Sequence, residues 1–164
     1  MNAADYGDRV FGKYEGIVRN NLDPMFGGRL EVEVPAVLGT EKVWARPCVP
    51  YAAQNLGLYF TPPTGALVWV EFLGGDTDQP IWSGCYWKNG EIPTRNINEM
   101  VLATPGGTVT VAGGNMPPEI RIELKDATSI TIRSKSISIN SSALGKIELG
   151  ANGTVVNDGA LEVK

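Results

Sequence analysis

The 164-residue sequence contains no histidine. Histidine is the commonest general base near neutral pH and a leading protein ligand for zinc, so its absence removes the usual centre of acid–base catalysis and of a zinc site. A Ser-His-Asp triad is excluded for the same reason. We therefore expect no enzyme activity, no catalytic or cofactor-binding residues and no metal site.

Cysteines are few, and long apolar runs and a signal sequence are missing. Cys48 and Cys85 are the only two cysteines, and no apolar run approaches the ~20 residues of a membrane-spanning helix. The N-terminus has neither the basic start nor the apolar core of a signal peptide. We therefore expect synthesis in the cytoplasm and any export by another route, with two buried free thiols favoured over a disulfide.

The chain also lacks an excess of positive charge, with a net charge of -4 and a pI near 4.9. This balance is untypical of a general nucleic-acid or anionic-membrane binder. Exposed tryptophans on a barrel can stack bases or sugars, but no basic residues cluster beside the four present here. We expect these four in a barrel core or against a neighbouring subunit: Trp44, Trp69, Trp82 and Trp87.

Two pairs of carboxylates have the spacing of acid–base partners. Asp76 and Asp78 lie in a glycine-rich turn, where aspartate bonds its own backbone. Glu31 and Glu33 alternate with apolar residues and so fall on the outer face of a strand. We interpret both pairs as structural.

The last 65 residues contain a ladder of short apolar pairs with period two. Its rungs are Ile120/Ile122/Leu124, Ile130/Ile132, Ile137/Ile139, Ile147/Leu149, Val155 and Leu161/Val163. Period two places alternate side chains on opposite faces of a strand, and the short intervals leave room only for tight turns. The pattern predicts a solenoid or β-helix.

A single ribbon with one apolar face cannot cover that face by itself. Identical chains wound around a shared axis would bury it and remove exposed strand edges. We therefore predict that residues 100–164 form an intertwined, trimeric β-helical needle. The polar residues expected on its outer face are Arg121, Glu123, Arg133, Lys135 and Glu148. The alternative is a monomeric β-sandwich half packed on the N-terminal part.

The N-terminal part predicts five strands and no helix. After a loosely held arm (1–13), strands are expected at 14–19, 29–35, 43–50, 66–73 and 79–87. Leu30, Val32 and Val34 share one face of the second strand. Five strands in about 75 residues are typical of a small closed barrel, here assigned to 14–90, with 91–99 as linker.

The barrel segment also contains an ordered series of short motifs. These are Gly16-Ile17-Val18, Asp23-Pro24, Gly28-Arg29-Leu30-Glu31-Val32, Trp44-Ala45-Arg46-Pro47, the run Pro62 to Phe72, Gly74-Gly75-Asp76 and Pro80-Ile81-Trp82-Ser83-Gly84. The series resembles the OB-fold domain of phage baseplate assembly protein V and of contractile injection spikes. The type VI secretion spike and extracellular particles of the Photorhabdus virulence cassette kind belong to this group.

The resemblance implies a five-stranded OB-fold barrel followed by a trimeric needle, in a phage tail or a phage-tail-like particle. The chain would be the central spike below the tube, with a hub protein at the barrel end and a small conical (PAAR-like) tip protein at the other. Sheath contraction would carry it through the target membrane, which is pierced rather than bound. Because 164 residues leave no room for a fused hub, lysozyme or effector domain, we expect the hub to be a separate chain.

Two other functions remain open. One is a trimeric tail-fibre or adhesin fragment that binds glycan, and the other is an OB-fold nucleic-acid-binding protein. A glycan groove on the shaft would need aromatic side chains, yet Phe, Tyr and Trp are absent after Trp87. That absence favours the needle.

Overall fold

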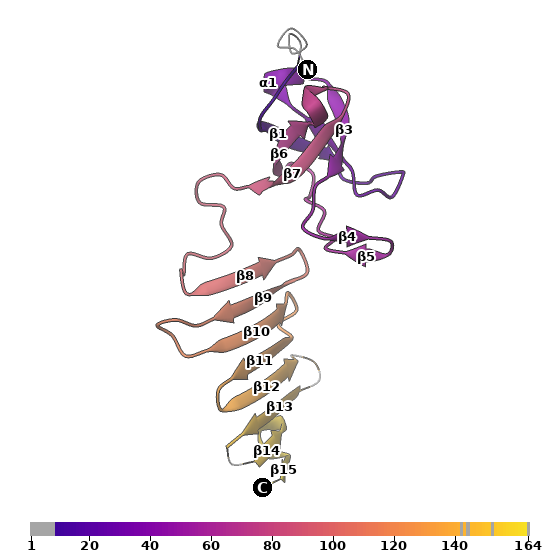
Figure 1. Cartoon of the computed structure of the whole chain (residues 1–164). Coiled ribbons are helices and arrows are strands. Elements are labelled where there is room, and N and C mark those ends of the chain that lie inside the picture. Colours follow the sequence, from indigo (N-terminus) through magenta and orange to yellow (C-terminus); the bar gives the residue numbers. More distant parts are fainter. Residues whose placement is uncertain (1–8, 142, 144, 152, 164) are drawn as a thin grey trace. The chain divides into compact units, whose positions relative to one another are not determined.

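The computed structural model describes residues 9–141, 143, 145–151 and 153–163, and the chain divides into two compact units that meet between Gly90 and Glu91 (Figure 1). Both units are built almost entirely from strands, as the sequence predicted. Among the described residues, no helix is long and apolar enough to cross a bilayer.

The first unit contains a closed five-stranded barrel with the order β1-β2-β3-β7-β6. Its strands are β1 (Tyr14–Asn20), β2 (Leu30–Glu33), β3 (Lys42–Pro47), β6 (Leu67–Phe72) and β7 (Pro80–Tyr86). The pairing of β3 with β7 is parallel and the other pairings are antiparallel. Leu30, Val32 and Val34 are fully buried in the barrel core, as their alternation predicted.

The barrel differs from the prediction by one helical turn, α1 (Pro35–Leu38). Proline suits the first helical position because its ring fixes φ and its missing N–H would have no partner there. Gly39 ends the turn with a φ of 61°, which glycine adopts without strain. The prediction treated Pro35 only as the end of a strand, whereas it also begins this turn.

The described part of the predicted arm is held against the barrel. The Val10 N–H donates to the Gly75 carbonyl at 2.9 Å, and Arg9 Nη1 donates to the Gly74 carbonyl at 3.0 Å. Val10 also packs against the barrel core. Residues 9–12 are therefore not loose, and the rest of the predicted arm lies outside the described residues.

Both thiols are free, but Cys48 and Cys85 are exposed, so the prediction of burial was wrong. Cys48 follows the end of β3. Cys85 follows a shift in the register between β6 and β7, pairs with Val68 and is the next-to-last residue of β7, where its side chain stays exposed. Strand-like residues flank both cysteines in the sequence, but they do not decide which side chains a strand leaves exposed.

The second unit is one antiparallel meander of eight strands in chain order. Its strands are β8 (Glu99–Ala103), β9 (Gly107–Ala112), β10 (Glu119–Leu124), β11 (Ser129–Arg133), β12 (Ser136–Ser141), β13 (Gly145–Gly150), β14 (Gly153–Val156) and β15 (Leu161–Val163). Every predicted rung falls in a strand of this sheet, which runs from salmon to yellow in Figure 1. Val155 is an exception in its face, because it pairs with Glu148 on the polar side and the next residue, Val156, takes the apolar position.

Strand pairing within this sheet differs from an intertwined β-helix. Each strand pairs with its neighbour in the same chain, because the short connections return each strand beside the previous one. The described strands β8–β15 are thus paired within one chain, without a strand of another copy between them. Association of whole sheets into a trimer stays a prediction.

Candidate interaction surfaces

Two columns of apolar side chains cross the sheet of the second unit. In one column the directly paired residues are Leu102, Val109, Ile122, Ile130, Ile139, Ile147, Val156 and Leu161. In the other they are Met100, Val111, Ile120, Ile132, Ile137, Leu149 and Thr154. Because directly opposed residues share a face, these apolar columns form one continuous face from β8 onward.

The apolar columns remain substantially exposed in the single chain. Each of their seven isoleucines exposes 38–42 % of its surface, and Met100 exposes 79 %. Soluble monomers rarely expose contiguous apolar patches larger than a few hundred Å². This face of the sheet is therefore a candidate interface.

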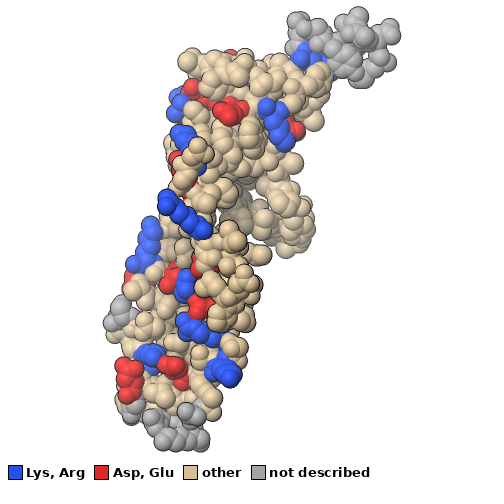
Figure 2. All heavy atoms as spheres, turned by 90° about the vertical axis from the view of Figure 1, so that its left-hand side faces the viewer, with Lys and Arg blue, Asp and Glu red and all other residues tan. Residues whose placement is uncertain are grey.

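The opposite face is polar and its charges are paired. Arg121 Nη1 and Nε lie 2.8 Å from Glu119 Oε1 and Glu123 Oε2, and Arg133 Nε lies 2.7 Å from Glu119 Oε2. Small hydroxyl residues lie beneath these longer side chains, and Thr131 is only 8 % exposed. On the side of the molecule shown in Figure 2, acidic and basic residues of the second unit are interspersed. Such a mixed surface is suited to face water.

In the first unit, Asp23 and Arg29 clamp the loop between β1 and β2. Arg29 Nη2 and Nε donate to Asp23 Oδ1 at 2.7 and 3.1 Å, and three backbone N–H groups, those of Met25, Gly27 and Arg29, donate to the same carboxylate. The Arg29 guanidinium, followed by these N–H groups, holds the pKa of Asp23 well below its ordinary value. Both residues belong to the motif series of the sequence, which did not predict that they pair.

The clamp makes barrel stability depend on acid pH. A carboxylate with a lowered folded-state pKa stabilises the fold above its ordinary pKa of about 3.9, and this contribution is lost as pH falls through the folded-state value. Asp23→Asn should therefore reduce stability at pH 7 and show a smaller further loss below about pH 5 than the unchanged chain.

Urea unfolding followed by tryptophan fluorescence at pH 7, 5 and 3 measures this effect, because all four tryptophans precede the second unit. Glu41→Gln, at an exposed turn residue after α1, is the matched control and should keep the original pH dependence. An Asp23→Asn variant with the same loss of stability between pH 5 and 3 as the unchanged chain would contradict the role of the clamp.

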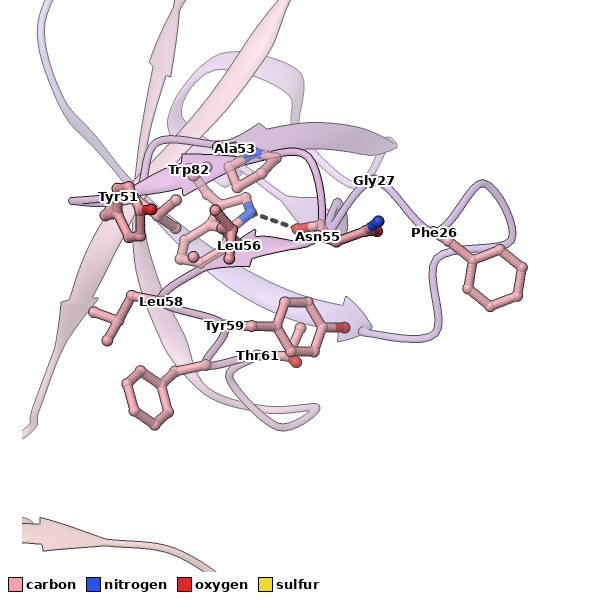
Figure 3. Close-up of a pocket in the computed structure, with 16 residues that line it drawn as sticks. Phe26, Gly27, Tyr51, Ala53, Asn55, Leu56, Leu58, Tyr59, Thr61 and Trp82 are labelled. Carbon is pink, nitrogen blue, oxygen red and sulfur yellow. Dashed lines mark hydrogen bonds between the residues drawn. The ribbon is translucent and has the colours of Figure 1, made fainter.

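Beside the clamped loop lies a hollow of about 440 Å³. It is lined by the loop tip, by the segment carrying β4 (Ala52–Ala53) and β5 (Leu56–Gly57), and by Trp82. Trp82 Nε1 donates to the Gly28 carbonyl at 3.2 Å, the dashed line in Figure 3. No strand was predicted for residues 51–60, and the hollow was not predicted either.

The carboxylate pairs weighed in the sequence occupy structural positions. Asp76 Oδ1 accepts from the Asp78 N–H at 3.0 Å and Oδ2 accepts from Gln79 Nε2 at 3.1 Å, which fixes the turn before β7. Glu33 Oε2 accepts from Arg19 Nε across the β1–β2 pair at 2.8 Å. Among the described residues, no group of three or more possible ligands gathers as a metal site would require.

The four tryptophans have different environments. Trp82 is 6 % exposed in the core and Trp87 is 64 % exposed. Trp69 and Trp44 are half-buried: Trp69 lies 4.5 Å from the Tyr86 ring, and the Arg29 guanidinium lies 5.3 Å from the Trp44 ring. One tryptophan is thus a core residue, and contact of the others with a neighbouring subunit remains a prediction.

Comparison with known proteins identifies the first unit. No curated protein matches the chain. Residues 14–87 match the family described as the type VI secretion system/phage-baseplate injector OB domain, and these residues span the closed five-stranded barrel. The barrel of this chain therefore belongs to the injector OB-domain family of phage baseplates and type VI secretion systems.

Proposed function

We propose that this chain is a non-enzymatic central spike subunit of a contractile injection system or phage baseplate, and that it works as a homotrimer. Its OB domain gives it a baseplate-related structural role. The observation that carries the proposal of a trimeric spike is the pair of exposed apolar columns. They cross the sheet of the second unit without a break as far as Leu149 and Val156.

Trimerisation would cover these columns. Full burial of an isoleucine stabilises by about 1.5–3 kcal/mol, so covering the roughly two-fifths still exposed on seven isoleucines contributes on the order of 5 kcal/mol per chain. Three sheets with their apolar faces turned to a common axis also leave each paired, polar face in water. Whole sheets associate in this arrangement, which is compatible with the intrachain pairing of β8–β15.

The meander suits a part that transmits force along one axis. Antiparallel hydrogen bonds run perpendicular to the strands, which is the direction in which β8–β15 are stacked. With neighbouring strands about 4.8 Å apart, eight strands extend about 35 Å. This length is comparable to the ~30 Å hydrocarbon core of a bilayer, which supports a piercing role.

The two ends of the chain suggest where partners bind. The hub would contact the barrel, because a tail tube requires an adaptor at that end. In the described part of the chain β15 pairs only with β14, so its other edge offers backbone groups that a tip protein would cover. The particle would be a phage tail or a phage-tail-like machine.

The other two functions find less support in the structure. The hollow contains aromatic residues that could stack a base or a sugar, but no lysine or arginine is among the residues that line it. A single-strand binder combines such rings with a positive groove. On the sheet, a glycan site would lack aromatic side chains because none follows Trp87.

Light scattering of the purified full chain tests the proposal. We expect a mass close to three times 17.6 kDa at micromolar concentration. A clean mass of one chain would reject the trimer and with it the needle. Co-purification of hub, tube and sheath proteins with the chain from intact particles would then test its place in the machine.

A further inference from the structure

The segment that borders the hollow is devoid of charge. From Pro47 to Val70, 24 consecutive residues include no Asp, Glu, Lys or Arg, although charged residues make up 20 % of the chain. At this frequency about five charges would be expected. Cores of protein–protein interfaces show this depletion together with enrichment in Tyr, Phe and Trp.

Large apolar side chains of this segment and of the neighbouring loop lie together around the hollow. We call them the barrel patch: Phe26, Tyr51, Leu56, Leu58, Tyr59 and Phe60. They are exposed by 96, 56, 62, 46, 75 and 52 %, respectively. Figure 3 shows Leu56 on β5 and Tyr51, Leu58 and Tyr59 on the segments beside the β4–β5 hairpin, with the Phe26 ring directed away from the hollow.

The barrel patch is large for a surface that remains in water. An aromatic side chain buries about 150–250 Å², so the four aromatic residues alone expose on the order of 400–700 Å². The largest apolar patch on a typical monomer is about 300–600 Å², and one side of a standard interface buries about 800 Å². The patch therefore has the size of an interface core.

Its geometry is fixed before any partner binds. The Asp23 clamp holds the loop that carries Phe26, which adopts a φ of 53° that non-glycine residues rarely adopt. Tyr59 lies over Gly28, where a Cβ atom would be 3.7 Å from the Tyr59 ring. Pre-organised surfaces lose less conformational entropy on association.

We infer that the barrel patch packs against the barrel of a neighbouring copy within the same trimer, which rests on the proposed trimer of the second unit. Residues 91–98 between Gly90 and β8 span at most about 30 Å, so the barrels of an assembled trimer lie close to one another. Short tethers give effective concentrations in the millimolar range. The neighbouring barrel is thus an apolar surface that the patch meets at high effective concentration.

The absence of charge is consistent with contact between copies. Around a rotation axis the same patch is repeated, so a charge near the axis would approach its own copies and repel them. An uncharged patch avoids this repulsion. A partner that binds mainly through its charge, such as nucleic acid, would instead need a positive surface on the barrel.

Thiol labelling of the full chain tests the inference. In a Cys48→Ser, Cys85→Ser background, Tyr59→Cys and Gln54→Cys report on the barrel patch and on the exposed turn between β4 and β5. Glu41→Cys, at an exposed turn outside the hollow, is the control. The mass of each variant is measured in the same sample by light scattering.

In the trimer we expect the cysteine at position 59 in the patch and the cysteine at position 54 in the adjoining turn to react with Ellman's reagent at least tenfold more slowly than the control cysteine. Adding Ile137→Glu, which we expect to separate the copies, should bring the three rates together. A trimeric mass with equal rates would overturn this inference and leave the proposed spike intact, with the patch open to a different protein. If the Cys48→Ser, Cys85→Ser chain that keeps Ile137 had the mass of one chain, both this inference and the proposed trimer would be overturned.

Discussion

Replacing Ile137 by glutamate should convert the proposed trimer into single chains at micromolar concentration. Ile137 lies in the middle of the second apolar column, between Ile132 and Leu149, and is 39 % exposed in the single chain. Its replacement removes about 1 kcal/mol of further burial in each copy. It also brings an ionised carboxylate from each chain to the axis, where desolvation costs several kcal/mol for each charge. Light scattering should therefore report about 17.6 kDa.

Ser136→Glu is the matched control on the neighbouring residue. Ser136 faces the other side of the sheet and is directly paired with Arg133, which can pair with the new carboxylate. This variant should keep the trimeric mass. Circular dichroism of both variants separates loss of association from loss of the sheet. An Ile137→Glu chain that retains the mass of three copies would show that the apolar columns are not the interface.

The sequence predicted the strands of the second unit well because their pattern is local. Alternation identifies which residues share a face, and short intervals between rungs require tight turns. Which strands pair is decided by the same turns, since a connection of a few residues can only return the chain beside the strand just completed. The prediction of intertwining considered how copies might cover the apolar face and overlooked this consequence of the turns.

Side-chain partners across a loop were harder to predict. Asp23 and Arg29 are six positions apart in the sequence. At this separation the path of the loop between two charged residues decides whether their side chains meet. The turn formers in residues 20–28 indicated a loop but not its path. Only the path, with Phe26 and Gly28 at positive φ, brings both side chains together.

The barrel patch was missed for a different reason. Irregular segments have no period, so analysis of alternation assigns them neither a face nor a depth. A signal was nevertheless present in the sequence. The uncharged run from Pro47 to Val70 contains 24 residues and is longer than any single strand of the barrel. Val68 and Val70 at the end of this run are uncharged because they are buried in the barrel core, whereas the exposed residues before them match the charge-poor, aromatic-rich composition of interface cores.

Deleting everything after Ile97 should give a folded but monomeric barrel. All strands of the barrel and its buried core precede this point, so tryptophan fluorescence should resemble that of the full chain. The apolar columns are removed entirely. Without them the barrel patch loses its millimolar effective concentration, and an interface of this size need not hold at micromolar concentration. Light scattering should therefore report a single chain.

A shorter deletion, of residues 151–164, is the matched control. It removes β14 and β15 but retains β8–β13 and six residues of each apolar column. This chain should remain trimeric, with a lower thermal midpoint because less apolar surface is covered. If the barrel that ends at Ile97 instead kept the mass of three chains, the barrel patch rather than the sheet would drive association. The barrels would then bring the three copies together, and the sheets would associate only as a result.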